Sequence, residues 1–135
     1  MESTNRTKII IRGIDAVKIM ESFLVFFYIL DQCYDICLEN DLGGFLGSIS
    51  PELWENGKPI DPAIYNDWKL QNGGKKIDEI NIIKIIYDFL EFYEKRFGFN
   101  FVQTKNTLIN NITNDIIKNA IEYARHMNRL YSYKE

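Results

Sequence analysis

The sequence predicts an all-α protein, a single-domain helical bundle (residues 1–135) of three long and two short helices. Two observations favour this class. Apolar residues recur at steps of three and four over long stretches, which is the period of an amphipathic helix. Residues typical of helix starts and helix ends separate those stretches. The length of 135 residues and a hydrophobic content of 46% suit one buried core.

The first long helix is predicted from Asp15 to Glu39, with Asp15 as its N-cap. Its apolar residues cover most of its circumference, so we expect it to be the central helix of the core. The glycine-rich stretch at 41–47 is expected to break this helix and to form a close crossing between a helix and a loop. Its glycines, which we expect to serve backbone geometry, are Gly43, Gly44 and Gly47.

Proline next to a capping residue indicates the two short helices. Ser50 precedes a proline and opens a short turn through Trp54, and Asp61-Pro62 starts a helix that runs through Trp68 and ends at the glycines that follow Asn72. The remaining two long helices are predicted at 78–97, where a glycine follows, and at 104–131. Residues 17–27 and 83–93 align with five identities, which fits either a duplication or two helices of similar composition.

Composition and charge exclude several classes of protein. A net charge of −3 rules against a generic nucleic-acid binder, which needs a surplus of Lys and Arg. The longest apolar run, Phe23 to Leu30, is far shorter than the roughly 20 residues of a membrane span. Without a signal peptide we expect a cytoplasmic protein with reduced cysteines, no membrane partner, no metal and no cofactor.

The motifs of common enzymes are also missing from the sequence, so we expect a protein that is not an enzyme. The one histidine, His126, follows an arginine on a predicted helix and has no evident nucleophile to serve. Asp31 and Asp35 are a carboxylate pair that suits acid–base chemistry. A solvated helix face is the commoner explanation of their spacing of four residues.

Acidic residues gather in one part of the chain. From Asp31 to Asp67 there are eight acids and one base, a net −7, whereas the rest of the chain carries +4. Segregation of this kind predicts an acidic patch that binds a basic protein surface, with Asp35 and Glu39 exposed and an aromatic residue as an apolar anchor. Alternatively, the tryptophans hold the loops against the bundle and the acids are only solvated. The residues predicted to bind the partner are Asp31, Asp35, Glu39, Asp41, Glu52, Trp54, Glu55, Asp61, Tyr65 and Asp67.

The same region carries a likeness to a known family. The segments DLGGFLGS at 41–48, NGKPIDPA at 56–63 and DW at 67–68 form a pattern that resembles small bacterial immunity proteins of polymorphic-toxin and contact-dependent inhibition systems. Asn56 departs from the pattern, in which Asp is commoner at this position. The resemblance implies a non-enzymatic cytoplasmic protein that neutralises a cognate toxin by binding it. The residues of the pattern that we expect to be structural are Gly43, Gly44, Gly47, Pro62 and Trp68.

Two other classes stay open at this point. One is a helical scaffold or regulatory protein that binds another cellular partner, and the other is an enzyme that works through carboxylates alone. The sequence identifies neither the toxin, nor its activity, nor the oligomeric state. It also leaves open whether a bound toxin is blocked at its active site or at another surface.

Overall fold

The computed structural model describes residues 17–51 and 62–131, and in these ranges it is all-helical, with no strand. The all-α prediction is confirmed. The predicted number of helices is wrong, because the described residues form six helices where five were expected for the whole chain. In chain order they are α2 (Ile19–Cys37), α3 (Asn40–Ile49), α4 (Pro62–Asn72), α5 (Ile82–Phe97), α6 (Val102–Asn110) and α7 (Asn114–Tyr131).

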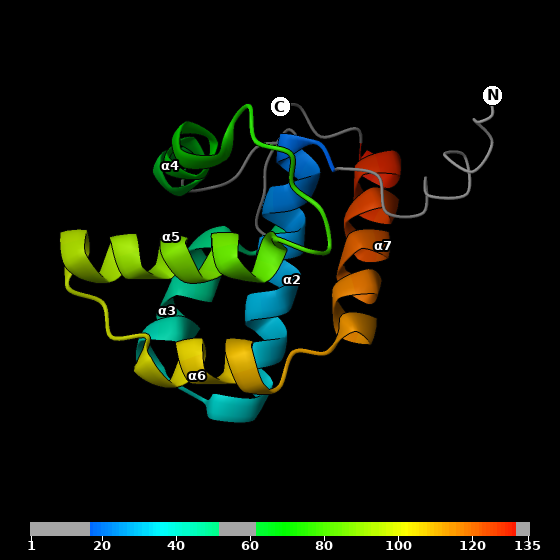
Figure 1. The fold of residues 1–135 in the computed structure, drawn as a ribbon. Coiled ribbons are helices and arrows are strands. Elements are labelled where there is room, and N and C mark those ends of the chain that lie inside the picture. The colour runs from blue at the N-terminus through cyan, green and yellow to red at the C-terminus, as the bar shows by residue number, and fades with distance from the viewer. Residues whose placement is uncertain (1–16, 52–61, 132–135) are drawn as a thin grey trace, which may run out of the picture.

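Helix α2 is the centre of the core, as its apolar circumference predicts. It contacts α3, α4, α6 and α7, and Figure 1 shows α7 alongside it, with α5 and α6 crossing its direction. Phe23, Phe26 and Ile29 on α2 have no exposed surface. Four of the other described helices, α3, α4, α6 and α7, therefore pack against this one helix.

An aromatic cluster joins α4 and α5 to α2. Trp68 is fully buried, stacks on Phe26 with ring centroids 4.5 Å apart, and meets Phe89 edge-on at 5.3 Å. The indole N–H of Trp68 donates a hydrogen bond of 2.9 Å to the buried Ser22 hydroxyl, which itself donates to the backbone carbonyl of Ile19. Both buried polar groups are thus satisfied, as burial requires. The structural role expected for Trp68 is confirmed.

The prediction that the glycine-rich stretch breaks the helix is wrong. Helix α2 ends at Cys37, and Leu38 adopts a left-handed conformation with φ of 52° before α3 begins at Asn40. The stretch is itself helical because its apolar side chains are buried against the core, and that burial outweighs the low helix propensity of glycine, about 1 kcal/mol per residue. These buried residues are Leu42, Phe45, Leu46 and Ile49.

Only one of the three glycines in α3 is required by packing. A Cβ atom on Gly43 would lie 3.0 Å from Cε1 of Tyr34, so this glycine lets α3 approach the side chain of Tyr34 on α2. A Cβ atom on Gly44 or Gly47 would meet nothing within 4 Å, and neither has a positive φ. None of the three glycines has a positive φ or a close backbone neighbour, so the expected backbone role is wrong, and the close approach at Gly43 is to a side chain.

The boundaries of the helices that follow α3 agree better with those predicted from the sequence. Helix α4 begins at Pro62 and ends at Asn72, and α5 ends at Phe97, where Gly98 is left-handed with φ of 78°. Helix α5 begins at Ile82, four residues later than predicted, because the Asp78 carboxylate accepts the backbone N–H groups of a preceding turn. The rest of the predicted short turn after Ser50, together with Asp15, lies outside the described residues.

The predicted last helix at 104–131 is two helices, α6 and α7. Helix α6 starts two residues earlier than expected and ends at Asn110, where weak helix formers follow. The hydroxyl of Thr113 accepts the backbone N–H of Ile116 at 3.2 Å, and so caps the start of α7. Among the described helices, none combines the length and the apolar character needed to cross a membrane.

Candidate functional site

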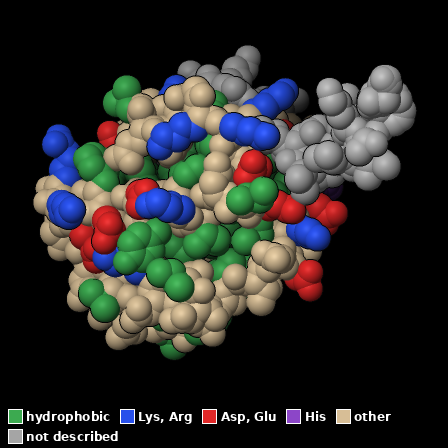
Figure 2. Space-filling model, in the orientation of Figure 1, with side chains coloured by type: hydrophobic (Ala, Val, Ile, Leu, Met, Phe, Trp, Pro, Cys, Tyr) green, Lys and Arg blue, Asp and Glu red, His purple; other side chains and the backbone are tan. Residues whose placement is uncertain are grey.

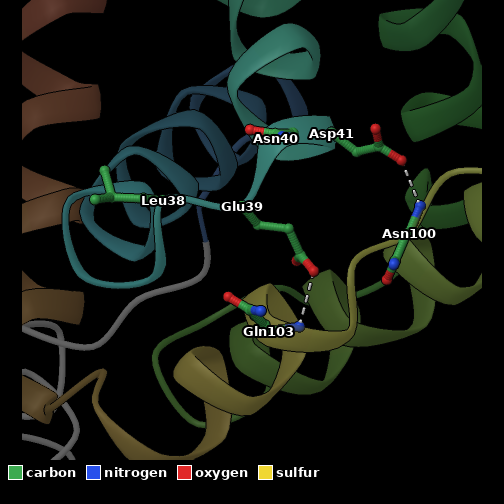
Figure 3. Close-up of a pocket in the computed structure, with 6 residues that line it drawn as sticks. All are labelled: Leu38, Glu39, Asn40, Asp41, Asn100 and Gln103. Atoms are coloured by element: carbon green, nitrogen blue, oxygen red, sulfur yellow. Dashed lines mark hydrogen bonds between the residues drawn. The ribbon is translucent and has the colours of Figure 1, made fainter.

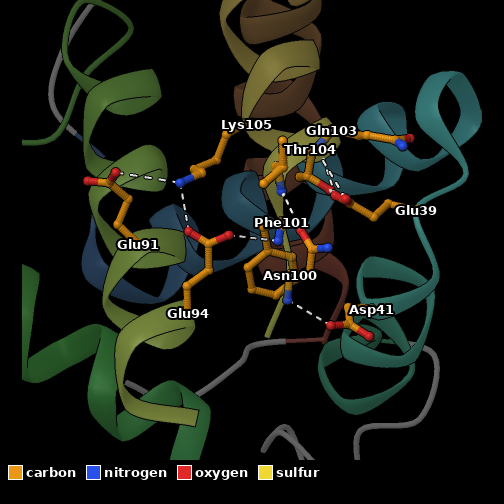
Figure 4. A network of polar contacts seen from close by, with 10 residues as sticks. Glu39, Asp41, Glu91, Glu94, Asn100, Phe101, Gln103, Thr104 and Lys105 are labelled. Carbon is orange, nitrogen blue, oxygen red and sulfur yellow. Dashed lines mark hydrogen bonds and ion pairs between the residues drawn. The ribbon is translucent and has the colours of Figure 1, made fainter. Parts of the chain in front are cut away.

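The start of α6 is held by carboxylates from two distant parts of the chain. Five consecutive backbone N–H groups, at 100–104, each donate a hydrogen bond to a side-chain oxygen (Figure 4). Such N–H groups have no partner within a helix and need acceptors from outside it. The acceptors are Asp41 for Asn100 (2.7 Å), Glu94 for Phe101 (2.8 Å), Asn100 for Val102 (3.1 Å), and Glu39 for Gln103 (3.1 Å) and Thr104 (2.8 Å).

Glu39 acts as the N-cap that α6 does not supply itself. Phe101 occupies the N-cap position and has no side-chain acceptor, so the Glu39 carboxylate accepts both of the next free N–H groups. It also accepts the Thr104 hydroxyl at 2.8 Å. A negative charge at a helix N-terminus is stabilised by the helix dipole. The main role of Glu39 in the described structure is thus to join the end of α2 to the start of α6.

A lysine completes this network on the other side. The Lys105 ammonium contacts Glu94 at 2.6 Å and Glu91 at 3.5 Å, and its side chain is only 15% exposed. It also lies 5.3 Å from the centroid of the Tyr87 ring. The hydrogen bond to Glu94 raises the pKa of Lys105 above its usual value, although burial opposes this. Lys105, near the start of α6, therefore neutralises part of the negative charge of the two glutamates on α5.

A polar hollow of about 430 Å³ opens beside the α2–α3 junction. Figure 3 shows Glu39 and Asp41 reaching across it to Gln103 and Asn100. Leu38, which is 65% exposed, lines this hollow, and Ile36, which is 52% exposed, lies two residues earlier in the last turn of α2. The residues that line the hollow are Leu38, Glu39, Asn40, Asp41, Asn100 and Gln103.

The described acids of the predicted patch differ in exposure, and several accept internal hydrogen bonds. Asp35 is exposed and Asp31 is half-buried on α2. Glu39 is half-buried, so the expectation that it is exposed is wrong: α2 ends at Cys37, and Glu39 leaves the helical stripe of Asp31 and Asp35 to cap α6. Asp41 and Asp67 also accept internal hydrogen bonds. The predicted partner-binding residues that lie outside the described residues are Glu52, Trp54, Glu55 and Asp61.

Tyr65 is not the exposed apolar anchor that the sequence suggests. It is 5% exposed and packs against Phe23 with ring centroids 5.0 Å apart, while Lys69 lies 4.9 Å above its ring. Burial against the central helix fits the apolar spacing of α4, in which Ile64, Tyr65 and Trp68 form one face. Exposed apolar side chains at the α2–α3 junction belong instead to Ile36 and Leu38.

A second hollow, of about 320 Å³, lies between α3, α4 and α5 and is largely aromatic. Among the described residues that line it, the one carboxylate belongs to Asp67, which accepts a hydrogen bond of 2.7 Å from the Tyr93 hydroxyl. This site is not among those predicted from the sequence, although the aromatic residues around Gly98 indicate an aromatic surface there. The lining residues are Phe45, Ser48, Ala63, Ile64, Asp67, Tyr93, Phe97 and Phe99.

A third hollow, of about 390 Å³, lies between the start of α5 and the end of α6. Ile80 (80% exposed) and Ile109 (60% exposed) stand at its edges, with Lys84 beside them. Figure 2 shows this face of the molecule, on which hydrophobic side chains gather among lysines and arginines. The residues that line this third hollow are mainly apolar, whereas those that line the hollow at the α2–α3 junction are mainly polar or acidic.

The described residues contain no cluster of metal ligands, and one of the two cysteines is fully buried. No group of three or more His, Cys, Asp or Glu side chains within 17–51 and 62–131 is arranged to hold a metal ion. Burial raises the pKa of the Cys33 thiol to about 12, and the neighbouring Cys37 adds to the shift. Cys33 is fully buried and therefore remains a protonated packing residue at neutral pH.

No protein-family model, no curated protein and no solved structure matches this chain. The resemblance to immunity proteins therefore depends on the motif residues alone and stays a prediction.

Proposed function

We propose that this chain is a non-enzymatic immunity protein of the cytoplasm, which binds a cognate, basic bacterial toxin domain and thereby neutralises it. The contact is made by the junction surface, which we define as Asp35, Ile36, Leu38, Glu39 and Asp41 together with the polar hollow that the last three of these residues line. The observation that carries the proposal is the combination, at one junction, of exposed aliphatic side chains with carboxylates.

Two properties of the junction surface suit a basic protein partner. Ile36 and Leu38 offer apolar contact area that is still exposed, and such residues supply binding energy when a partner excludes water from them. Glu39 and Asp41 are already fixed by their bonds to the 100–104 segment, so little side-chain entropy is lost when they accept a cation. A carboxylate has about four acceptor positions, and the single hydrogen bond to Asp41 leaves room for a lysine or an arginine.

Charge supports the choice of a basic partner. The segment from Asp31 to Asp67 carries a net −7, which favours encounter with a positively charged surface and disfavours acidic ones. The assignment to immunity proteins depends on the glycine, proline and tryptophan pattern between 41 and 68, which the fold uses at Gly43 and Trp68. That pattern supports a common fold, and the acidic junction surface supports a binding role.

The test is to co-express the chain with the product of the gene directly upstream, and then to measure the kinetics of the purified pair. Asp35→Lys is expected to slow association by about threefold or more at low salt, and the difference should shrink as salt is raised. Leu38 has a positive φ, which asparagine tolerates, so Leu38→Asn should keep the backbone conformation. Because the variant removes the exposed apolar side chain, it should speed dissociation by about tenfold.

The matched control for charge reversal is Glu122→Lys on α7, which changes the net charge equally at an exposed position away from the junction. Thermal melting checks that each variant is folded. If Asp35→Lys and Glu122→Lys, both folded, associate at the same rate as the parent chain, the junction surface is not the docking site. If no complex forms with the parent chain, the immunity function is wrong.

A further inference from the structure

The hollow between α3, α4 and α5 is built mainly from aromatic rings. Phe45 and Tyr93 form a buried floor, with exposures of 2% and 3% and ring centroids 5.6 Å apart. Phe97 is 53% exposed and packs edge-on against Tyr93 at 4.8 Å, and the half-buried Phe99 stacks over Tyr93 at 6.1 Å. Ring surface is therefore presented to an entering group at the mouth of the hollow as well as below it.

One carboxylate stands among these rings. Asp67 is half-buried, and its Oδ2 accepts the Tyr93 hydroxyl at 2.7 Å. Within residues 17–51 and 62–131 no lysine or arginine forms an ion pair with Asp67. The hydrogen bond fixes the carboxylate and leaves acceptor positions for a further donor. A carboxylate beside aromatic ring faces offers a cation both an ionic partner and cation–π contacts.

We infer that this hollow receives the guanidinium group of an arginine side chain from a basic protein partner. A guanidinium is planar, stacks on aromatic rings and binds a carboxylate through two parallel hydrogen bonds, whereas an ammonium is a compact and strongly hydrated charge. The volume of about 320 Å³ is at the lower end of ligand pockets, which suits one side chain. That the arginine comes from a toxin rests on the proposed function.

A nearby arginine of the chain itself bears on this inference. The guanidinium of Arg96 lies 5.4 Å from the centroid of the Phe97 ring, and Arg96 is not among the residues that line the hollow. Phe97 therefore already packs against a guanidinium on one side. Because the charge of Arg96 opposes a second cation, Arg96→Gln is expected to strengthen binding of an arginine probe about twofold.

The experiment uses the full chain and a small probe in place of the partner. N-acetyl-arginine methylamide is titrated while NMR spectra of backbone amides and aromatic side chains are recorded. We expect saturable shifts at Asp67, Phe97 and Phe99. The citrulline analogue has nearly the same shape but no charge, and it should bind at least about tenfold more weakly. The lysine analogue should bind about threefold more weakly than the arginine probe.

Two variants identify the groups that hold the probe. Asp67→Asn keeps an oxygen that accepts the Tyr93 hydroxyl, so it should fold, and it should weaken binding of the arginine probe at least about tenfold. Phe97→Leu retains apolar volume at an exposed position but removes the ring, and should weaken binding about threefold. Glu122→Gln on α7 removes the same charge as Asp67→Asn at an exposed site and should leave probe binding unchanged.

The outcomes separate this inference from the proposed function. If the arginine and citrulline probes bind equally, or if folded Asp67→Asn and Phe97→Leu both bind like the parent chain, the inference is wrong. The Asp35→Lys kinetics do not involve Asp67, so the junction surface is tested independently. Saturable binding of the arginine probe, lost in Asp67→Asn, supports the arginine site even where the product of the upstream gene forms no complex.

Discussion

Replacing Glu39 with alanine tests whether this acid holds the fold together. The change removes the acceptor for the N–H groups of Gln103 and Thr104 and for the Thr104 hydroxyl. Loss of a helix N-cap costs about 1 kcal/mol in the free energy of unfolding. Thr104 is fully buried, so its unpaired polar groups add about 1–2 kcal/mol, whereas water replaces the partner of the exposed Gln103. We expect a total loss of about 2–3 kcal/mol.

Two further variants separate charge from hydrogen bonding and from position. Glu39→Gln keeps one oxygen that can accept from Thr104 but loses the charge at the helix N-terminus and the second acceptor. Its cost should be about 1 kcal/mol, between those of alanine and the parent residue. Asp35→Asn removes the same charge at an exposed position four residues earlier and should change the free energy of unfolding by less than about 0.5 kcal/mol.

The assay is urea unfolding followed by far-ultraviolet circular dichroism, with hydrogen exchange of the Thr104 amide as a local measure. In the parent chain this amide should be protected, and in Glu39→Ala it should exchange much faster than amides in α2. A loss below about 0.5 kcal/mol for Glu39→Ala would refute the capping role. An equal loss in Asp35→Asn would show that general charge, and not the contact with α6, is responsible.

Two other predictions follow from the core. Phe26→Ala removes the ring that stacks on Trp68 and should cost about 3–5 kcal/mol by urea unfolding, so a cost under 1 kcal/mol would mean that the core is wrongly described. Burial raises the pKa of Cys33 to about 12 in the folded chain, and an unfolded thiol ionises above about pH 9. The folded state therefore holds the extra proton, and the free energy of unfolding should fall as pH rises from 9, by about 1 kcal/mol per pH unit, in circular-dichroism melts. The raised pKa of Lys105 also makes the free energy of unfolding fall as pH rises, but at still higher pH. In Cys33→Ala, the fall in the free energy of unfolding between about pH 9 and 10 should be visibly smaller.

The core of this fold can be predicted from the sequence because the spacing of apolar residues along each helix identifies the positions that are buried. The apolar circumference of residues 19–37 can be buried only at the centre of a helical protein, and Trp68 follows a proline-capped helix start. The glycine after Phe97 ends α5 because only a residue without a Cβ adopts a φ of 78° at little cost. These features depend on a few neighbouring residues, so they can be interpreted without knowledge of the tertiary structure.

The errors arise where a tertiary contact outweighs a local preference. Glycines at 43, 44 and 47 predict a break, but Leu42, Phe45 and Ile49 share a buried face that makes the segment helical. The apolar spacing of 104–131 predicts one helix, yet the chain turns after Asn110 and restarts under the Thr113 cap. A single sequence carries both signals and does not show which is stronger.

The candidate sites could be predicted only in part, because the roles of the acids depend on residues far along the chain. Glu39 and Thr104 are 65 positions apart, and Asp67 and Tyr93 are 26 apart. Charge counting treats all of these acids alike and so overstates how many are exposed. It identifies correctly that carboxylates gather near the end of α2, and it gives Asp35 as an exposed one.

An acid that stabilises the fold can still contribute to binding, and the two roles have different experimental signatures. Glu39 is fixed by the 100–104 segment, so its charge lies at a constant place on the junction surface whether or not a partner is bound. If the junction surface binds the partner as proposed, removing Glu39 should lower both the free energy of unfolding and the affinity, whereas changing Asp35 should alter the association rate and leave the fold intact. Because carboxylates held in this way would lose little entropy on binding, the proposed docking of a basic partner does not require many exposed acids at the junction surface.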